Sequence, residues 1–375
     1  MKIFKYIILL YIASFLLASC SETYRPGEQL KTVEEDTIKI PENEALLKFI
    51  NHSGDYISSK KMPSIVSSDN VYDNLGKYYV IDIRSHQEYV DGHINGSVHV
   101  NPSEILAYLD KKVAPSIYDK LVIVCQSGQA SAYVTSILRL FGYSNAYSMK
   151  YGMSSWNKTL DEWSSKISSS YISKLETKTN PVEGMFPYPE IKTGKHCGAE
   201  ILEARAKTLL HTPFQKLKIS ADRIFKNPDE FYVINIWSKE RYEVGHIPGA
   251  YNYSAKKDLN SKTLLNTIPN DKKILVYGYT GQTSAYVMAY LRLLGYNAFT
   301  LANGANSFMH NTLSIRNWNA FDAAKKVNDF PLIKGENPTD KAFESSISKG
   351  SGPQKSAPKK KVVRRKKKEV EGGCG

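Results

Sequence analysis

Apolar residues follow two patterns along the chain, one typical of buried strands and one typical of helices. The runs YYVIDI (78–83) and KLVIVC (120–125) are largely apolar, of strand length and rich in β-branched residues. Such runs indicate strands buried on both faces of a parallel sheet. The stretch ASAYVTSILRLFGY (130–143) has helical spacing and closes on Gly142, which favours a helix stop. Alternating strands and helices predict an α/β layer architecture.

The same pattern occurs twice. Tyr79 of YVIDIRSHQEYVDGHINGS matches Tyr232 of YVINIWSKERYEVGHIPGA, and Cys125 matches Gly278; both pairs are 153 positions apart. A register kept over such a stretch indicates duplication of a whole folding unit. A predicted helix precedes each copy, NEALLKFI (43–50) with Asn43 as its N-cap and AEILEARAKTLLHT (199–212). We therefore expect two α/β domains, each a small parallel sheet flanked by helices.

Composition changes along the chain divide it into six predicted segments. Polar, Pro-rich and Gly-rich stretches separate the two periodic regions, and the C-terminus is of low complexity. The segments are a signal peptide (1–19), a flexible tether (20–42), the first domain (43–165), an exposed linker (166–196), the second domain (197–335) and a disordered tail rich in Lys and Arg (336–375).

The net charge of +13 is concentrated at the ends of the chain. Nine Lys and Arg against two Glu lie after Gly350, and Lys2 and Lys5 add two further positive charges. The remainder is only mildly basic, so bulk charge does not support a nucleic-acid partner. The tail resembles a nuclear localisation run, but in an exported protein we expect it to attract anionic lipid headgroups or envelope polymers.

The N-terminus has the form of an export signal. Two lysines precede the apolar run IILLYIASFLLAS, which is followed directly by Cys20. Leu17-Ala18-Ser19-Cys20 resembles a bacterial lipobox, which implies acylation of Cys20, a membrane lipid anchor and a place in the cell envelope. The alternative is an ordinary signal peptide with an incidental cysteine.

The three other cysteines, Cys125, Cys197 and Cys374, show no spacing typical of a disulfide framework or a zinc site. Cys125 ends a predicted buried strand and precedes a short loop and a helix starting near Ala130. Loop N–H groups and a helix N-terminus converge on such a position and stabilise a thiolate. Gly128 suits a tight backbone turn in this loop. The alternative is an inert core cysteine.

The stretches DIR…EYVDGHINGS, LVIVCQSGQAS and YGMSSW, with GHIPGA and GYTGQTSA in the second copy, resemble the rhodanese domain. The resemblance implies a parallel five-stranded sheet, no cofactor, and a sulfurtransferase in which Cys125 takes sulfane sulfur from thiosulfate, a persulfide or a polysulfide. It implies a nucleophile at Cys125 and a substrate-binding loop made of Gln126, Ser127, Gly128, Gln129, Ala130 and Ser131.

The sequence departs from the family pattern at Ala130, where active members often carry Arg or Thr. We expect weaker thiosulfate binding as a result, and the lack of Arg argues against phosphatase or arsenate-reductase chemistry. In the second copy, Gly278 replaces the thiol while the loop keeps Thr283. This half resembles the inactive partner domain of tandem sulfurtransferases and could still bind anions.

Other polar residues of the motifs are interpreted as structural. Arg84 and Glu88 are four apart at a helix start and are expected to pair, close to Asp82. The second copy has Asn235 and Trp237 in place of Asp82 and Arg84. His93 recurs as His246 in the copy without a thiol, which favours a structural hydrogen bond over catalysis.

Two alternatives stay open. The two domains could form a non-catalytic binding or scaffold module, which Ala130 and the missing second nucleophile favour. Cys374, in a mobile arm, is either incidental or an acceptor of sulfur from Cys125.

Overall fold

The computed structural model describes residues 40–336, and those up to Gly335 belong to one compact unit. The predicted signal peptide and tail, and with them Cys20 and Cys374, lie outside the described residues. None of the helices within residues 40–336 has the length and hydrophobicity needed to span a bilayer.

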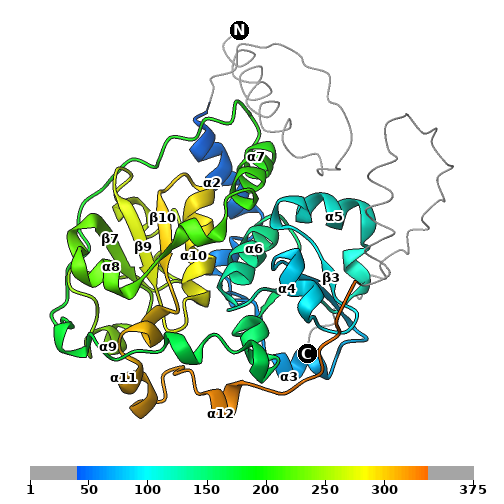
Figure 1. Ribbon diagram of the computed structural model, residues 1–375. Helices are drawn as coiled ribbons and strands as arrows, with labels where there is room; N and C mark the ends of the chain where they lie inside the picture. The colour runs from blue at the N-terminus through cyan, green and yellow to red at the C-terminus, as the bar shows by residue number, and fades with distance from the viewer. Residues whose placement is uncertain (1–39, 337–375) are drawn as a thin grey trace, which may run out of the picture. The chain divides into compact units, whose positions relative to one another are not determined.

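Each copy of the duplicated pattern forms a five-stranded, all-parallel sheet flanked by helices, which confirms the predicted fold (Figure 1). The strand order is β1-β5-β4-β2-β3 in the first half and β6-β10-β9-β7-β8 in the second. The strands are β1 (Ile65–Val66), β2 (Tyr78–Asp82), β3 (Val98–His99), β4 (Lys120–Val124), β5 (Ala146–Met149), β6 (Lys218–Ile219), β7 (Phe231–Asn235), β8 (Tyr251–Asn252), β9 (Lys273–Tyr277) and β10 (Ala298–Leu301).

The central strands β4 and β9 are buried on both faces, as their apolar runs predicted. The α-helices are α2 (Glu42–His52), α3 (Ser68–Tyr72), α4 (His86–Asp91), α5 (Ile105–Lys112), α6 (Gln129–Leu140), α7 (Gly198–Leu210), α8 (Ala221–Lys226), α9 (Lys239–Tyr242), α10 (Gln282–Leu293), α11 (His310–Ile315) and α12 (Ala323–Lys326). The N-cap prediction for α2 was wrong: Pro41 occupies that position, and the Asn43 side chain donates to the carbonyls of Tyr188 and Pro189.

Helices α6 and α10, which follow the two equivalent loops, pack against each other and join the halves. Nearly every residue of both helices is buried, so each helix is covered on all sides and not only on one face. The Ser136 hydroxyl donates to the Tyr286 carbonyl at 2.9 Å across this contact, and α2 packs on α7 beside it. The two halves therefore share one buried interface.

The halves also exchange their C-terminal segments. The chain after α12 crosses to the first half, where Ile333 pairs with His93, and Phe330 and Leu332 pack on the first core (Figure 1). The linker after the first half does the same in the second: Glu176 pairs with His246, and Tyr171 and Leu175 pack on the second core. Residues 327–335, which the sequence assigned to the second domain, thus cover the first.

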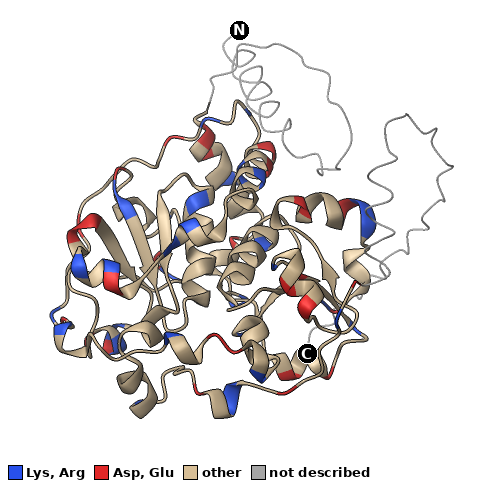
Figure 2. Ribbon diagram, viewed as in Figure 1, with Lys and Arg blue, Asp and Glu red and all other residues tan. Residues whose placement is uncertain are grey.

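Lys and Arg are interspersed with Asp and Glu over the described residues, with no face of a single sign in the view of Figure 2. This distribution agrees with the mildly basic body inferred from the sequence.

Candidate functional site

Cys125 directly follows β4 and lies at the carboxyl end of the first sheet, where the chain turns into α6. Its side chain is 5% exposed. The backbone N–H groups of Gly128 and Ser131 both donate to its sulfur at 3.2 Å, and the Ser131 hydroxyl lies 3.5 Å away. Two amide donors aimed at one sulfur stabilise a thiolate, or a persulfide anion in the same place.

The loop after Cys125 is held in shape by the segment that follows β5. Met153 donates its N–H to the Cys125 carbonyl at 2.9 Å, and the indole of Trp163 donates to the Ser127 carbonyl at 3.1 Å. Gly152 has a φ of +61°, and a Cβ there would lie 2.1 Å from the Cys125 carbonyl oxygen. The YGMSSW motif therefore supports the loop through close backbone contact, and this close approach requires a glycine at position 152.

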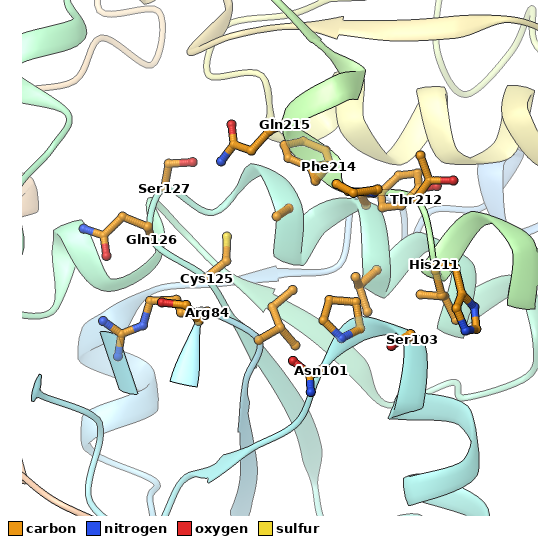
Figure 3. Close-up of a pocket in the computed structure, with 18 of the residues that line it drawn as sticks. Arg84, Asn101, Ser103, Cys125, Gln126, Ser127, His211, Thr212, Phe214 and Gln215 are labelled. Atoms are coloured by element: carbon orange, nitrogen blue, oxygen red, sulfur yellow. The ribbon is translucent and has the colours of Figure 1, made fainter. Parts of the chain in front are cut away.

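The thiol faces a pocket of about 420 Å³ (Figure 3). On one side lie the loop residues and the end of β2; on the other lies the segment between α7 and β6, which belongs to the second half. Thr212, Phe214 and Gln215 from that segment stand across the pocket from Cys125 in Figure 3. Its second-half wall consists of Leu210, His211, Thr212, Pro213, Phe214, Gln215 and Lys218.

The predicted substrate-binding loop has three different roles in the structure. Gln126, Ser127 and Ala130 line the pocket, and Gly128 and Ser131 hold the sulfur. Gln129 does neither. It is 1% exposed, donates to the Leu301 carbonyl and accepts from the Asn303 N–H, so its amide ties the first half to the end of β10.

Gln282, the counterpart of Gln129, makes the reciprocal contacts. It donates to the Gly128 and Met149 carbonyls and accepts from the Tyr151 N–H. The active-type loop is therefore supported by a buried side chain of the opposite half. A sequence pattern within one copy does not reveal this partner.

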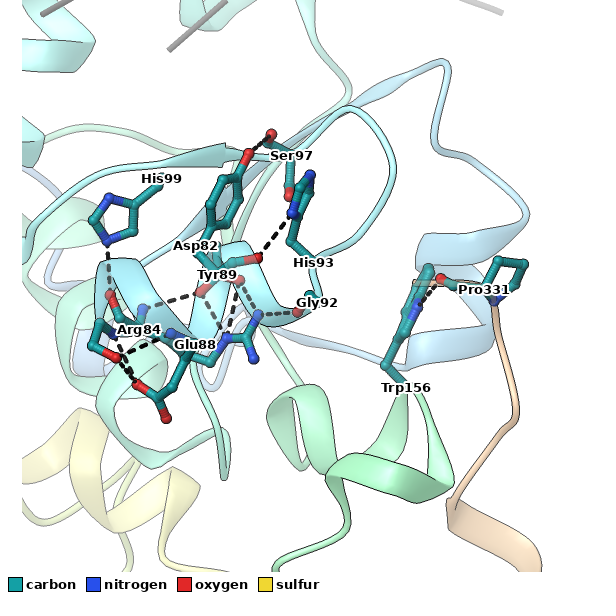
Figure 4. A network of polar contacts seen from close by, with 11 residues as sticks. Asp82, Arg84, Glu88, Tyr89, Gly92, His93, Ser97, His99, Trp156 and Pro331 are labelled. Carbon is teal, nitrogen blue, oxygen red and sulfur yellow. Dashed lines mark hydrogen bonds and ion pairs between the residues drawn. The ribbon is translucent and has the colours of Figure 1, made fainter. Parts of the chain in front are cut away.

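Polar residues at the end of β2 and the start of α4 form a network, in which Asp82 and Arg84 are buried (Figure 4). Arg84 pairs with Asp82 at 2.7 Å and donates to the Gly92 carbonyl at 2.7 Å. The predicted pair with Glu88 was wrong, because Arg84 precedes α4 and is not on its surface. Glu88 instead accepts from the Ser85 backbone N–H in a capping box at the start of α4. Asp82 and Arg84 are held by each other, as expected of structural residues.

His93 and His246 occupy equivalent places. Each ring contacts the carbonyl four residues earlier through Nδ1 at 2.9 Å and stacks on the tyrosine there, Tyr89 or Tyr242. Burial lowers the pKa of His246 and favours its neutral form. Neither ring lines the Cys125 pocket, consistent with the structural interpretation.

The second half has its own pocket, of about 360 Å³, at the equivalent place. Gly278, Tyr279, Thr280 and Thr283 line it from the loop, and Pro63, Ile65, Ser67 and Lys150 line it from the first half. Trp237 fills the position of Arg84 and stacks on Tyr279 at a centroid distance of 4.9 Å. Without a sulfur atom at Gly278, this pocket has no nucleophile for a covalent sulfur step.

Among the described residues, no three His, Cys, Asp or Glu side chains come together in a group that could hold a metal ion. Neither Cys125 nor Cys197 forms a disulfide with a cysteine of the described residues. Cys197 is the residue preceding α7 and is absent from the lining of the Cys125 pocket.

Sequence reasoning missed the second-half wall of the pocket. Its residues run from the end of a predicted helix to the start of the first strand of the second copy and match no motif. A signal does exist: β1 and β6 are equivalent strands, and Ile65 and Lys218, their first residues, each line the pocket of the opposite half. That correspondence identifies the wall of a site only once the arrangement of the two halves is known.

Comparisons with known proteins agree with this geometry. The rhodanese-like domain model matches residues 67–159 and 220–311. Thiosulfate sulfurtransferase GlpE of Pseudomonas fluorescens is 34% identical over 80 residues, which is 21% of this chain and 71% of that protein. The GlpE protein of Pseudomonas paraeruginosa is 32% identical over 77 residues, 20% of this chain and 67% of that protein.

Among solved structures, a rhodanese-related protein from Thermoplasma volcanium is 26% identical and covers 24% of this chain and 84% of its own, with a TM-score of 0.20. Each family match covers four of the five strands of one parallel sheet, β2 to β5 in the first half and β7 to β10 in the second. The chain therefore belongs to the rhodanese family and carries two rhodanese-like domains in tandem.

Proposed function

We propose that this protein is a sulfurtransferase in which Cys125 carries sulfur as a persulfide. The observation that supports this most is the pair of amides, from Gly128 and Ser131, that converge on the Cys125 sulfur at the edge of a pocket. The relatives named thiosulfate sulfurtransferase support the same reaction class.

The first proposed step is attack of the Cys125 thiolate on the outer sulfur of thiosulfate. A new S–S bond forms, the S–S bond of thiosulfate breaks, and its electron pair leaves with sulfite. In the second step a nucleophile such as cyanide or a thiolate attacks the outer persulfide sulfur, and the Cys125 thiolate is released. Polysulfides and persulfides serve as donors in the same way, with a shorter sulfur chain as the leaving group.

Only the first half supports this chemistry. The loop amides cost no reorganisation during the reaction, since Met153 and Trp163 hold the loop in place beforehand. Ala130 supplies no side-chain donor to the pocket. We therefore expect thiosulfate to be a weaker donor here than in family members with Arg or Thr in that position.

The experiment is steady-state cyanolysis with thiosulfate and, separately, with polysulfide, following thiocyanate formation. Turnover that disappears in Cys125→Ser and persists in Cys197→Ser supports the proposal. No turnover with either donor, together with saturable binding of thiosulfate, would instead support the binding or scaffold module.

We also propose a membrane location through acylation of Cys20, on the sequence evidence of the lipobox-like segment. Cys20→Ala is expected to move the protein from the membrane to the soluble fraction. Continued membrane fractionation of that variant contradicts the lipid anchor.

A further inference from the structure

Lys218 is the one lysine that lines the Cys125 pocket. It is the first residue of β6, in the half of the molecule that has no thiol, and its side chain is partly buried. Among residues 40–336, no hydrogen bond, ion pair or ring contact engages its ammonium group. A partly buried cation without a hydrogen-bonded partner is costly, so its place in the pocket of a thiol indicates an anionic ligand.

The groups around Lys218 agree with that interpretation. Burial lowers the pKa of Lys218, a thiolate at Cys125 and the Glu162 carboxylate raise it, and Lys166 lowers it. The charge of Cys125 thus acts directly on Lys218. A thiolate at Cys125 favours the ammonium form of Lys218.

The duplication provides an internal comparison. Ile65, the first residue of β1, is the counterpart of Lys218 and lines the pocket of the second half. At this equivalent position the pocket with the nucleophile receives a cation from β6, and the pocket with Gly278 receives an apolar side chain from β1. The lysine that lines the Gly278 pocket, Lys150, comes from a different position, directly after β5. The thiol and the lysine occur in the same pocket although the chain supplies them from different halves.

We propose that Lys218 is the anion-binding residue of the Cys125 pocket, holding the charged end of an anionic sulfur donor beside the thiol. Lys218 supplies the positive charge that the loop lacks because it has Ala130. The thiolate and thiosulfate are both anions, so their approach is unfavourable without a compensating charge. The assignment of an anionic sulfur donor as the ligand rests on the proposed sulfur transfer. The assignment of Lys218 as a cation that attracts anions to Cys125 does not rest on it.

The test separates those two parts by using alkylating reagents. Iodoacetate and iodoacetamide both transfer their carbon to the thiolate with loss of iodide, and they differ by one negative charge. Rates are measured at the Cys125 peptide of the full chain by mass spectrometry. We expect Lys218→Met to lower the ratio of the iodoacetate rate to the iodoacetamide rate on the order of tenfold. Lys218→Arg should keep the ratio.

The matched control is Lys150, which lines the second pocket from the first half. Burial, with a contribution from Lys326, lowers the pKa of Lys150 as well. Lys150→Met removes a similar partly buried charge and should leave the ratio at Cys125 unchanged. Lys218→Gln serves as a second variant if Lys218→Met fails to fold.

Kinetics with thiosulfate then test the substrate assignment. Lys218→Met should raise KM for thiosulfate on the order of tenfold and change kcat less, with recovery in Lys218→Arg. An unchanged alkylation ratio in Lys218→Met and Lys218→Gln, or no alkylation of Cys125 in the native chain, overturns the inference. A charge-dependent ratio without any sulfur transfer refutes the proposed function and leaves the anion site standing.

Discussion

Ala130 is the loop residue at which this chain departs from the family pattern, because active members often carry Arg or Thr there. It lines the pocket beside Cys125, and its counterpart in the second half is Thr283. The loop therefore stabilises a thiolate with backbone amides alone. The positive charge in this pocket comes from outside the loop.

Restoring a charged donor at this position should strengthen donor binding. Ala130→Arg is expected to lower KM for thiosulfate about tenfold, because a guanidinium adds charge-assisted hydrogen bonds to sulfonate oxygens. Ala130→Leu, of comparable reach but without charge, should not. Cyanolysis kinetics provide the measurement, and an Arg variant with the same or a higher KM contradicts this account of the loop.

The buried pair of Asp82 and Arg84 is a residue-scale feature with a large effect on stability. Their side chains are 1% and 2% exposed. Asp82→Ala leaves the guanidinium buried without its partner, which should lower the free energy of unfolding by about 3–5 kcal/mol. Urea denaturation measures this change.

Two controls accompany it. Lys325→Ala breaks an exposed pair with Asp322 and should barely move the midpoint. Asp82→Asn combined with Arg84→Trp installs the residues of the second half and should cost less than Asp82→Ala alone. If Asp82→Ala behaves like Lys325→Ala, the pair is not a structural anchor.

The turn from β4 into α6 is the element that creates the site. Gly128 has a φ of +83°, and a Cβ there would lie 2.6 Å from the Gln282 amide nitrogen. The turn thus depends on a left-handed residue and on close approach of the other half. The second condition is visible only when the halves are packed together.

Gly128→Ala should therefore destabilise the protein more than Gly142→Ala. Gly142 has a φ of +105° but open space around its Cβ position, so its variant carries only the conformational cost of roughly 1–2 kcal/mol. Gly128→Ala adds a steric clash and displaces a donor to the sulfur. Equal losses of stability in the two variants, with equal cyanolysis rates, contradict this view of the turn.

Sequence patterns predicted the regular elements well where burial alone determines them. The runs around β2 and β4, the helix after Gly128 and the repeat offset were all found this way. The cap of α2 and the partner of Arg84 were not, because each depends on a tertiary contact. The Asn43 side chain donates hydrogen bonds to the carbonyls of Tyr188 and Pro189, and Arg84 forms a buried ion pair with Asp82.

At the scale of the whole molecule, the exchanged segments bind the halves into one unit. Phe330 stacks on Tyr72 in the first half, and Leu175 packs on the second core. Each half buries apolar surface contributed by chain that follows the other half. Independent unfolding of one half therefore exposes apolar surface in both.

We expect one cooperative unfolding transition that both contacts affect. Phe330→Ala and Leu175→Ala should each lower the free energy of unfolding by about 2 kcal/mol, because both side chains are only partly buried. The fluorescence and circular dichroism transitions should shift together. Two separable transitions, each moved by one variant only, contradict the coupled arrangement.

The candidate site also depends on how the two halves are arranged in the whole molecule. The thiol and its loop follow from the motif, while the wall from Leu210 to Lys218 and the support from Gln282 come from the opposite half. No spacing within one copy encodes those contacts. The strand correspondence between Ile65 and Lys218 becomes informative only with the three-dimensional arrangement.

The central claim is that Cys125 carries sulfur, and peptide-resolved mass spectrometry of the full chain tests it most directly. After incubation with thiosulfate or polysulfide, the Cys125 peptide should gain the mass of one sulfur atom, and cyanide should remove it. Cys125→Ser should show no such gain at that peptide, and Cys197→Ser should behave like the native chain. Absence of the added sulfur on Cys125 with both donors would contradict the account.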